Sequence, residues 1–149
     1  MVSPRTFLFL FFSLCVCYGV DLAHKDCGST GEVIKVFSED CADPVCKAKK
    51  GHSYQIQMEF KPAGQVTTLK ALLYGVISGI PIPFPLPQPD GCVACGNVCP
   101  ISAATDSTYS AALKVESAYP AIKIVSRWIL QDQDSVKVIC IEIPVVIIS

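Results

Sequence analysis

The sequence has few of the residues that catalysis near neutral pH most often uses. Its 149 residues include two histidines, His24 near the N-terminus and His52 beside Gly51 in a turn. It has no GxSxG or HExxH motif and no glycine-rich loop that could cradle a phosphate. Because a nucleophile, a base and an orienting group cannot be assembled, we predict a protein without catalytic residues or cofactor, and not an enzyme.

An excess of positive charge is also lacking. The chain has 12 basic and 13 acidic residues, and its only short basic cluster is Lys47, Lys49 and Lys50. A nucleic-acid binder needs a clustered positive face. We therefore expect no nucleic acid partner.

No apolar run is long enough to span a bilayer as a helix. The run Phe7–Val16 follows Arg5 and precedes small residues near Gly19, which is the pattern of a secretory signal peptide. We predict a signal peptide over residues 1–19 and one mature domain over 20–149. The expected destination is extracellular, with the lysosome as the alternative.

Cysteines are plentiful in the predicted mature chain, which has seven: Cys27, Cys41, Cys46, Cys92, Cys95, Cys99 and Cys140. In an oxidising compartment they predict disulfides, with one thiol left over. Cys92 and Cys95 form a CxxC, but Cys99 follows and no histidine is near, so a local disulfide is favoured over a zinc or redox site. No metal site is predicted.

Prolines occupy every second position within residues 79–92, at Pro81, Pro83, Pro85, Pro87 and Pro89. Proline fixes φ, lacks an amide donor and disfavours helix at the preceding residue, so this proline segment is extended. Unlike a polar linker, it has apolar residues between its prolines: Ile80, Ile82, Phe84 and Leu86. No PxxP spacing occurs. We expect the edge of a sheet, with these side chains bordering a core or pocket.

The rest of the mature chain alternates apolar and polar residues over short runs. In residues 53–60, Tyr54, Ile56, Met58 and Phe60 fall on one face. Similar patterns predict strands at 32–37, 65–78 (continuous or with a bulge near Gly75), 108–116, 121–130 and 136–148. We predict an all-β fold, an immunoglobulin-like β-sandwich of about seven strands in two sheets.

A set of large side chains is predicted to point between the sheets: Tyr54, Met58, Leu72, Val115, Tyr119, Trp128 and Ile141. The simplest interpretation is a packed core. However, tyrosines and a tryptophan among aliphatic residues are also typical of ligand pockets. A ligand cavity bordered by the proline segment is the alternative.

Motifs along the whole mature chain resemble the Niemann-Pick type C2 (epididymal secretory) family of ML (MD-2-related lipid-recognition) domain proteins, including its insect members. They are KDCGS (25–29), KKGHSY (49–54), GIPIPFPLPQPDGC (79–92), CPI (99–101), TYS (108–110), YPAIK (119–123), WILQD (128–132) and CIEIPV (140–145). The resemblance implies a seven-stranded sandwich that holds a sterol or fatty-acid-like lipid between its sheets. It also implies the disulfides Cys27–Cys140, Cys41–Cys46 and Cys92–Cys99, with Cys95 as the free thiol or as the rival partner of Cys99.

The resemblance further implies a ligand-binding set: Tyr54, Ile82, Phe84, Val115, Tyr119, Pro120, Trp128 and Ile141. Ile80 and Ile82 would form a rim that transiently meets a membrane or a membrane receptor, and the carrier would be a monomer. Vertebrate members have a tryptophan where this chain has Ile141, and the stretch from Ser110 to Tyr119 is two residues shorter here. The ligand is therefore left open between a sterol, a fatty acid and a semiochemical. The alternative function is innate-immune recognition of microbial lipid.

Overall fold

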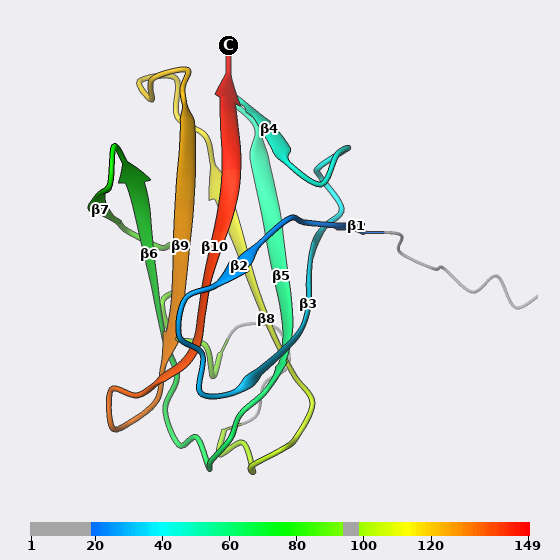
Figure 1. Cartoon of the computed structure of the whole chain (residues 1–149), viewed down its shortest axis with the longest axis vertical. Coiled ribbons are helices and arrows are strands. Elements are labelled where there is room, and N and C mark those ends of the chain that lie inside the picture. The colour runs from blue at the N-terminus through cyan, green and yellow to red at the C-terminus, as the bar shows by residue number, and fades with distance from the viewer. Residues whose placement is uncertain (1–18, 94–98) are drawn as a thin grey trace, which may run out of the picture.

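The computed structural model describes residues 19–93 and 99–149 (Figure 1). Apart from Gly19, the predicted signal peptide lies outside the described residues, and so does Cys95. Within the described ranges, no helix is long and apolar enough to cross a membrane.

One sheet has four antiparallel strands in the order β1-β3-β5-β8. They are β1 (Val20–Asp21), β3 (Glu32–Ser38), β5 (Ser53–Lys61) and β8 (Ser107–Lys114). Strand β5 alternates as predicted, with Ile56, Met58 and Phe60 buried. Since successive side chains point to opposite faces, this face packs against the second sheet.

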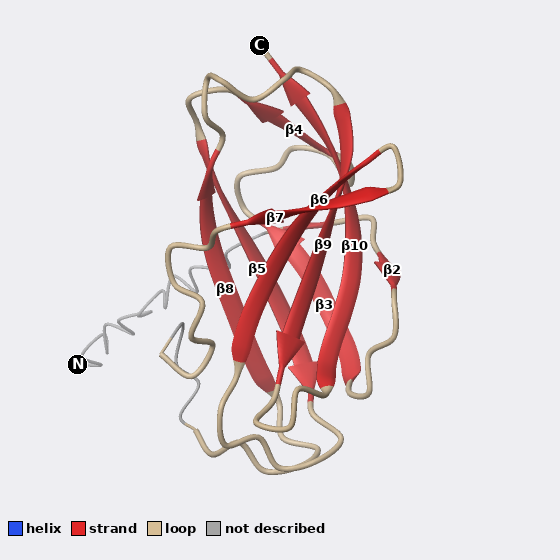
Figure 2. Ribbon diagram, turned by 90° about the vertical axis from the view of Figure 1, so that its left-hand side faces the viewer, coloured by secondary structure: helices blue, strands red, loops and turns tan. Residues whose placement is uncertain are grey.

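The second sheet has six strands in the order β2-β10-β9-β6-β7, with β4 also on β10. They are β2 (Lys25–Asp26), β4 (Cys46–Lys49), β6 (Lys70–Ile77), β7 (Ile80–Phe84), β9 (Lys123–Gln131) and β10 (Lys137–Ile148). Strands β2 and β4 pair with successive parts of β10, the first antiparallel and the second parallel. The sheets lie face to face (Figure 2), which confirms the predicted β-sandwich.

The predicted strand over 65–78 is wrong in its first part. Strand β6 begins at Lys70 and pairs with β9 and β7 in unbroken register through Gly75, so no bulge is present there. Val66 instead forms an isolated bridge with Ile101, and the N–H of Thr67 donates to the side chain of Gln133. These tertiary contacts, rather than strand pairing, fix residues 66 and 67.

The first part of the proline segment forms an edge strand, β7, as predicted, whereas residues 85–89 lie outside any strand. Ile77 and Ile80 pair across a two-residue turn in which Ser78 and Gly79 have φ of 52° and 79°. Positive φ at both positions is the signature of a type I′ hairpin turn, which suits glycine. Strand β7 then pairs with β6 alone and ends the sheet.

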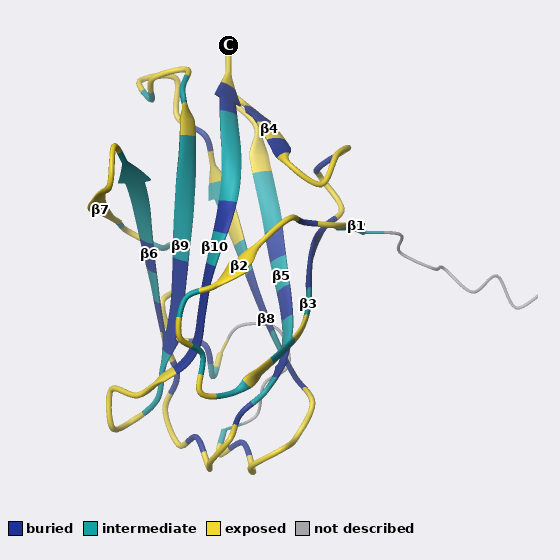
Figure 3. Cartoon of the chain, viewed as in Figure 1, coloured by how far each residue is buried: buried dark blue, intermediate teal, exposed yellow. Residues whose placement is uncertain are grey.

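Burial is uneven along the sandwich (Figure 3). Residues 128–130 of β9 and 138–141 of β10 are buried, whereas residues 124–127 and 144–146 are only half-buried. Among the described cysteines, three disulfides join Cys27 to Cys140, Cys41 to Cys46 and Cys92 to Cys99. The sheets therefore pack solidly at one end and leave space at the other.

Candidate functional site

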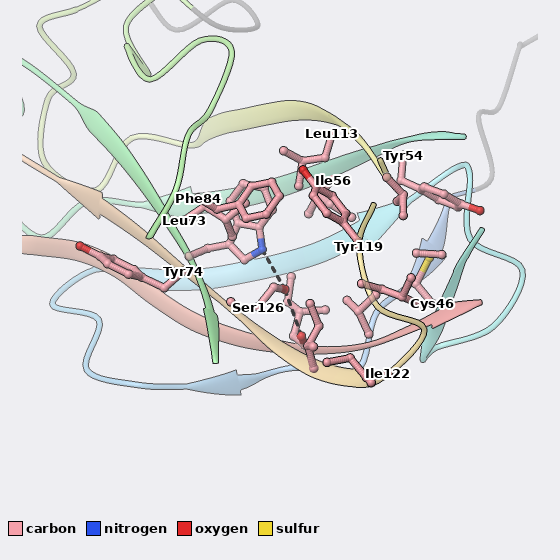
Figure 4. Close-up of a pocket in the computed structure, with 18 of the residues that line it drawn as sticks. Cys46, Tyr54, Ile56, Leu73, Tyr74, Phe84, Leu113, Tyr119, Ile122 and Ser126 are labelled. Atoms are coloured by element: carbon pink, nitrogen blue, oxygen red, sulfur yellow. Dashed lines mark hydrogen bonds between the residues drawn. The ribbon is translucent and has the colours of Figure 1, made fainter. Parts of the chain in front are cut away.

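A cavity of about 240 Å³ lies between the sheets, at the end where burial is incomplete (Figure 4). Its walls are residues of β4, β5, β6, β7, β8, β9 and β10, together with Leu22 and the segment between β8 and β9. Ile82 and Pro120 line it and are also exposed, so the cavity reaches the surface beside them.

Seven of the residues predicted to bind a ligand line this cavity: Tyr54, Ile82, Phe84, Val115, Tyr119, Pro120 and Trp128. They come from β5, β7 and β9 and from the segment between β8 and β9. Residues from distant parts of the sequence are thus brought to one apolar space. Ile80, predicted for the rim, is 64% exposed and does not line it.

Ile141 is the exception among the predicted residues. It is fully buried and pairs with Trp128 across β10 and β9, but it is not part of the cavity wall. On the other side of Trp128, Leu73 and Phe84 continue the same row and do line the cavity. At this level the cavity lies toward β6 and β7, so Ile141 belongs to the solid core.

Two other residues were predicted to point inward, and neither lines the cavity. Met58 is fully buried in the core cluster, in agreement with the packed-core interpretation. Leu72 is half-buried, whereas its neighbours Ala71 and Leu73 are buried. Because side chains alternate along a strand, the inward residues of β6 are Ala71 and Leu73, and the prediction for Leu72 is wrong.

Two aromatic rings close one side of the cavity. Phe84 on β7 and Tyr119 in the loop before β9 meet edge to face, with ring centroids 5.2 Å apart. Both residues are half-buried. Burial, followed by the charge of Glu116, raises the pKa of Tyr119 above its ordinary value. The Tyr119 side chain is therefore neutral at physiological pH and adds no charge to the site.

The polar groups of the wall are mostly engaged by the protein itself. The Tyr54 hydroxyl accepts from the N–H of Lys49 at 2.8 Å and donates to the carbonyl of Lys47 at 3.4 Å. It points away from the cavity (Figure 4). The Trp128 indole N–H donates to the Ser126 hydroxyl at 3.2 Å, which donates in turn to the carbonyl of Ile143 at 3.0 Å. A ligand therefore meets a wall that is apolar in character.

Some wall residues were not predicted from the sequence. Gly75 and Ser126 line the cavity, but small residues carry no apolar signal, and only strand register brings them together. Cys46 also lines it, although the only role predicted for it was the disulfide with Cys41. The histidines are elsewhere: His24 and His52 are exposed and do not line the cavity.

A β-sandwich with an apolar cavity between its sheets is the architecture of a protein that binds a hydrophobic ligand. A family model described as the ML domain matches residues 21–147. The chain belongs to the ML-domain family.

Named relatives cover most of the chain. It is 41% identical over 125 residues to "NPC intracellular cholesterol transporter 2" of Danio rerio, a match that covers 83% of each protein. It is 36% identical over 132 residues to "NPC intracellular cholesterol transporter 2 homolog a" of Drosophila melanogaster, covering 87% of this chain and 89% of the relative.

Solved structures agree with the fold. A Niemann-Pick type C2 protein from Japanese carpenter ant superposes with a TM-score of 0.78 at 26% identity, covering 85% of this chain and 100% of that one. Chicken MD-1 complexed with lipid IVa superposes with a TM-score of 0.53 at 14% identity, covering 81% and 85%. The second likeness shows the fold alone.

Proposed function

We propose that this chain is a lipid carrier that binds one sterol or other hydrophobic ligand in the cavity between its sheets. The observation that carries the proposal is the apolar wall, in which Ser126 and Trp128 hydrogen-bond to the protein and Phe84 packs on Tyr119. The names of the relatives, as cholesterol transporters, support a sterol as the first ligand to test.

Affinity in such a site comes from burying apolar surface. Each buried CH₂ contributes about 0.8 kcal/mol before the costs of association and ordering are subtracted. A ligand of lipid size can therefore reach micromolar affinity or better without a charged contact. The proposed contacts are Tyr54, Ile82, Phe84, Val115, Tyr119, Pro120 and Trp128, all in the cavity wall.

The surface beside the opening is proposed to deliver the ligand. Ile80 and Ile82 on the β6–β7 hairpin are 64% and 46% exposed, and Ile82 also lines the cavity. Apolar side chains at an opening can contact a membrane or a membrane receptor while the ligand leaves. The proposed carrier is a secreted monomer, released after removal of residues 1–19.

The binding test uses dehydroergosterol, a fluorescent sterol, with the wild-type protein and with Phe84→Ala and Trp128→Ala variants whose folding is verified by circular dichroism. We expect saturable binding to the wild type and weaker binding to both variants. Unchanged binding in both folded variants would refute the site. Mass spectrometry of an organic-solvent extract of the native protein would identify the natural ligand.

A second candidate is recognition of microbial lipid. Lys114 borders the cavity, and Lys47 and Lys49 lie on β4, tied to Tyr54 by its hydroxyl. These lysines could pair with phosphate groups of a lipopolysaccharide. Competition between lipopolysaccharide and dehydroergosterol separates the two functions, because a sterol carrier releases little sterol to lipopolysaccharide.

A further inference from the structure

The inward face of the six-stranded sheet contains one row with unusually small side chains. Strand pairing places Ile82, Gly75, Ser126 and Ile143 side by side on β7, β6, β9 and β10. All four line the cavity. The two central strands contribute a glycine and a serine, so the side chains in the middle of the row project less into the cavity than those at its ends.

The neighbouring residues on the same two strands are large. Leu73 pairs with Trp128 on one side of the row. On the other side, Ile77 and Ile124 are the next inward residues of β6 and β9, and all four of these side chains line the cavity. Gly75 and Ser126 therefore form a recess between two ridges of large apolar side chains. We call it the Gly75–Ser126 recess.

Gly75 is not required by the backbone. Its φ lies outside the left-handed region, and a Cβ built on it would have no atom within 4 Å. Glycine inside a strand weakens the strand, and it is found where a ligand or another backbone approaches closely. The empty space above Gly75 is thus a feature of the cavity rather than of the fold.

Ser126 presents little polarity to this space. Its hydroxyl accepts from the Trp128 indole N–H and donates to the Ile143 carbonyl (Figure 4). These bonds hold the side chain against its own sheet. Its hydroxyl proton is used by Ile143, so the recess favours an apolar ligand group there over one that needs a hydrogen-bond donor.

We propose that the Gly75–Ser126 recess holds the broadest part of the ligand and selects fused-ring lipids over single acyl chains. This inference rests on the proposed function, since it assumes a lipid in the cavity. A cavity of about 240 Å³ is below the ~300–1,000 Å³ of typical ligand pockets. If the recess is narrowed, the rest of this small cavity therefore cannot make up for the lost width.

The test compares dehydroergosterol, a ring ligand, with cis-parinaric acid, a linear fluorescent fatty acid. Gly75→Val adds three carbon atoms at the recess, and Gly75→Ala adds one and disturbs the strand less. We expect Gly75→Val to weaken dehydroergosterol binding by at least about tenfold and cis-parinaric acid binding by less than about threefold. Gly75→Ala should show the same preference to a smaller degree.

Gly64→Val is the matched control, because Gly64 also has open space at its Cβ and no positive φ, but it does not line the cavity. Thermal unfolding verifies that each variant is folded, and Gly75→Ala decides the outcome if Gly75→Val does not fold. If the Gly75 variants lose affinity equally for both probes, or for neither, the proposed role of the recess is wrong. Wild-type protein that binds only the fatty acid also overturns it, while leaving the carrier function intact. Binding of neither probe by the wild type refutes the carrier function itself, and the recess with it.

Discussion

The ring of Tyr119 meets the ring of Phe84 at an interplanar angle of 72°. One ring belongs to an edge strand and the other to a loop, so the contact joins two elements that no strand pairing connects. It covers the cavity on that side. Opening the cavity there requires this contact to break.

Removing one ring should speed ligand release. In Phe84→Ala we expect dehydroergosterol to dissociate at least about tenfold faster, because a side of the cavity is uncovered. Stopped-flow transfer to lipid vesicles measures the rate. In a double-mutant cycle with Tyr119→Ala, the free energies of unfolding should show a coupling of about 0.5–1.5 kcal/mol. Additive effects would show that the rings act separately.

The Ser126 hydroxyl should support stability through Trp128. Ser126→Ala leaves the indole N–H without its acceptor, and we expect the free energy of unfolding to fall by about 1–3 kcal/mol. Urea denaturation measures this change. Ser126→Thr, which keeps a hydroxyl, is the control and should lose less. Equal losses in the two variants would contradict the role of the hydrogen bond.

Trp128 should report directly on the cavity. It is the only tryptophan in the sequence and it lines the cavity wall. Bound dehydroergosterol absorbs where tryptophan emits, so titration with it should quench Trp128 emission by energy transfer. Sterol that binds by equilibrium dialysis without quenching lies outside the cavity.

The disulfides that close the longest and the shortest loops should contribute differently to the free energy of unfolding. Cys27–Cys140 spans 113 residues and Cys41–Cys46 spans 5. In the chain-entropy description, the first stabilises by about 5 kcal/mol and the second by about 2 kcal/mol. Paired Cys→Ser variants, compared by chemical denaturation, should follow that order. The reverse order would mean that native contacts dominate over loop closure.

Asp26 should make stability fall in acid. The Ser29 side chain, followed by the backbone N–H groups of Gly28 and Ser29, lowers the pKa of Asp26 below its ordinary value of 3.8. Since the pKa is lower in the folded state, the stabilisation is present above pH 3.8 and is lost as pH falls through the folded pKa. Asp26→Asn should flatten the fall in unfolding free energy below pH 3.8. Asp43→Asn, in an exposed loop, should keep the fall, and an identical profile in Asp26→Asn would contradict the assignment.

The sequence predicts the fold well where alternation is strong. Strand β5 has the inward residues that its pattern indicates, and the prolines mark an edge strand. Prediction fails where apolar residues are continuous. In ALLYGVIS, both Leu72 and Leu73 could face inward, and only pairing with β9 and β7 selects Leu73.

The candidate site is predictable only in part for a related reason. Large side chains such as Phe84 and Trp128 indicate an apolar surface in the sequence, but they do not show where the packing between the sheets leaves a cavity. Ile141 is as apolar as Leu73 and Phe84, which lie in the same row across the sheet, and it still lies in the solid core. Space is created by small residues such as Gly75 and Ser126, and their effect depends on register across strands.

The register of β7 in the proline segment also restricts edge-to-edge strand pairing between molecules of this protein. Residues that flank a two-residue hairpin turn form a hydrogen-bonded pair, so the N–H groups of Ile80, Ile82 and Phe84 face β6. Pro81 and Pro83 then occupy the outer edge, which carries carbonyls but no amide donors. A strand of a second molecule cannot extend the sheet there by a regular ladder. An exposed apolar strand is thereby protected against edge-to-edge aggregation.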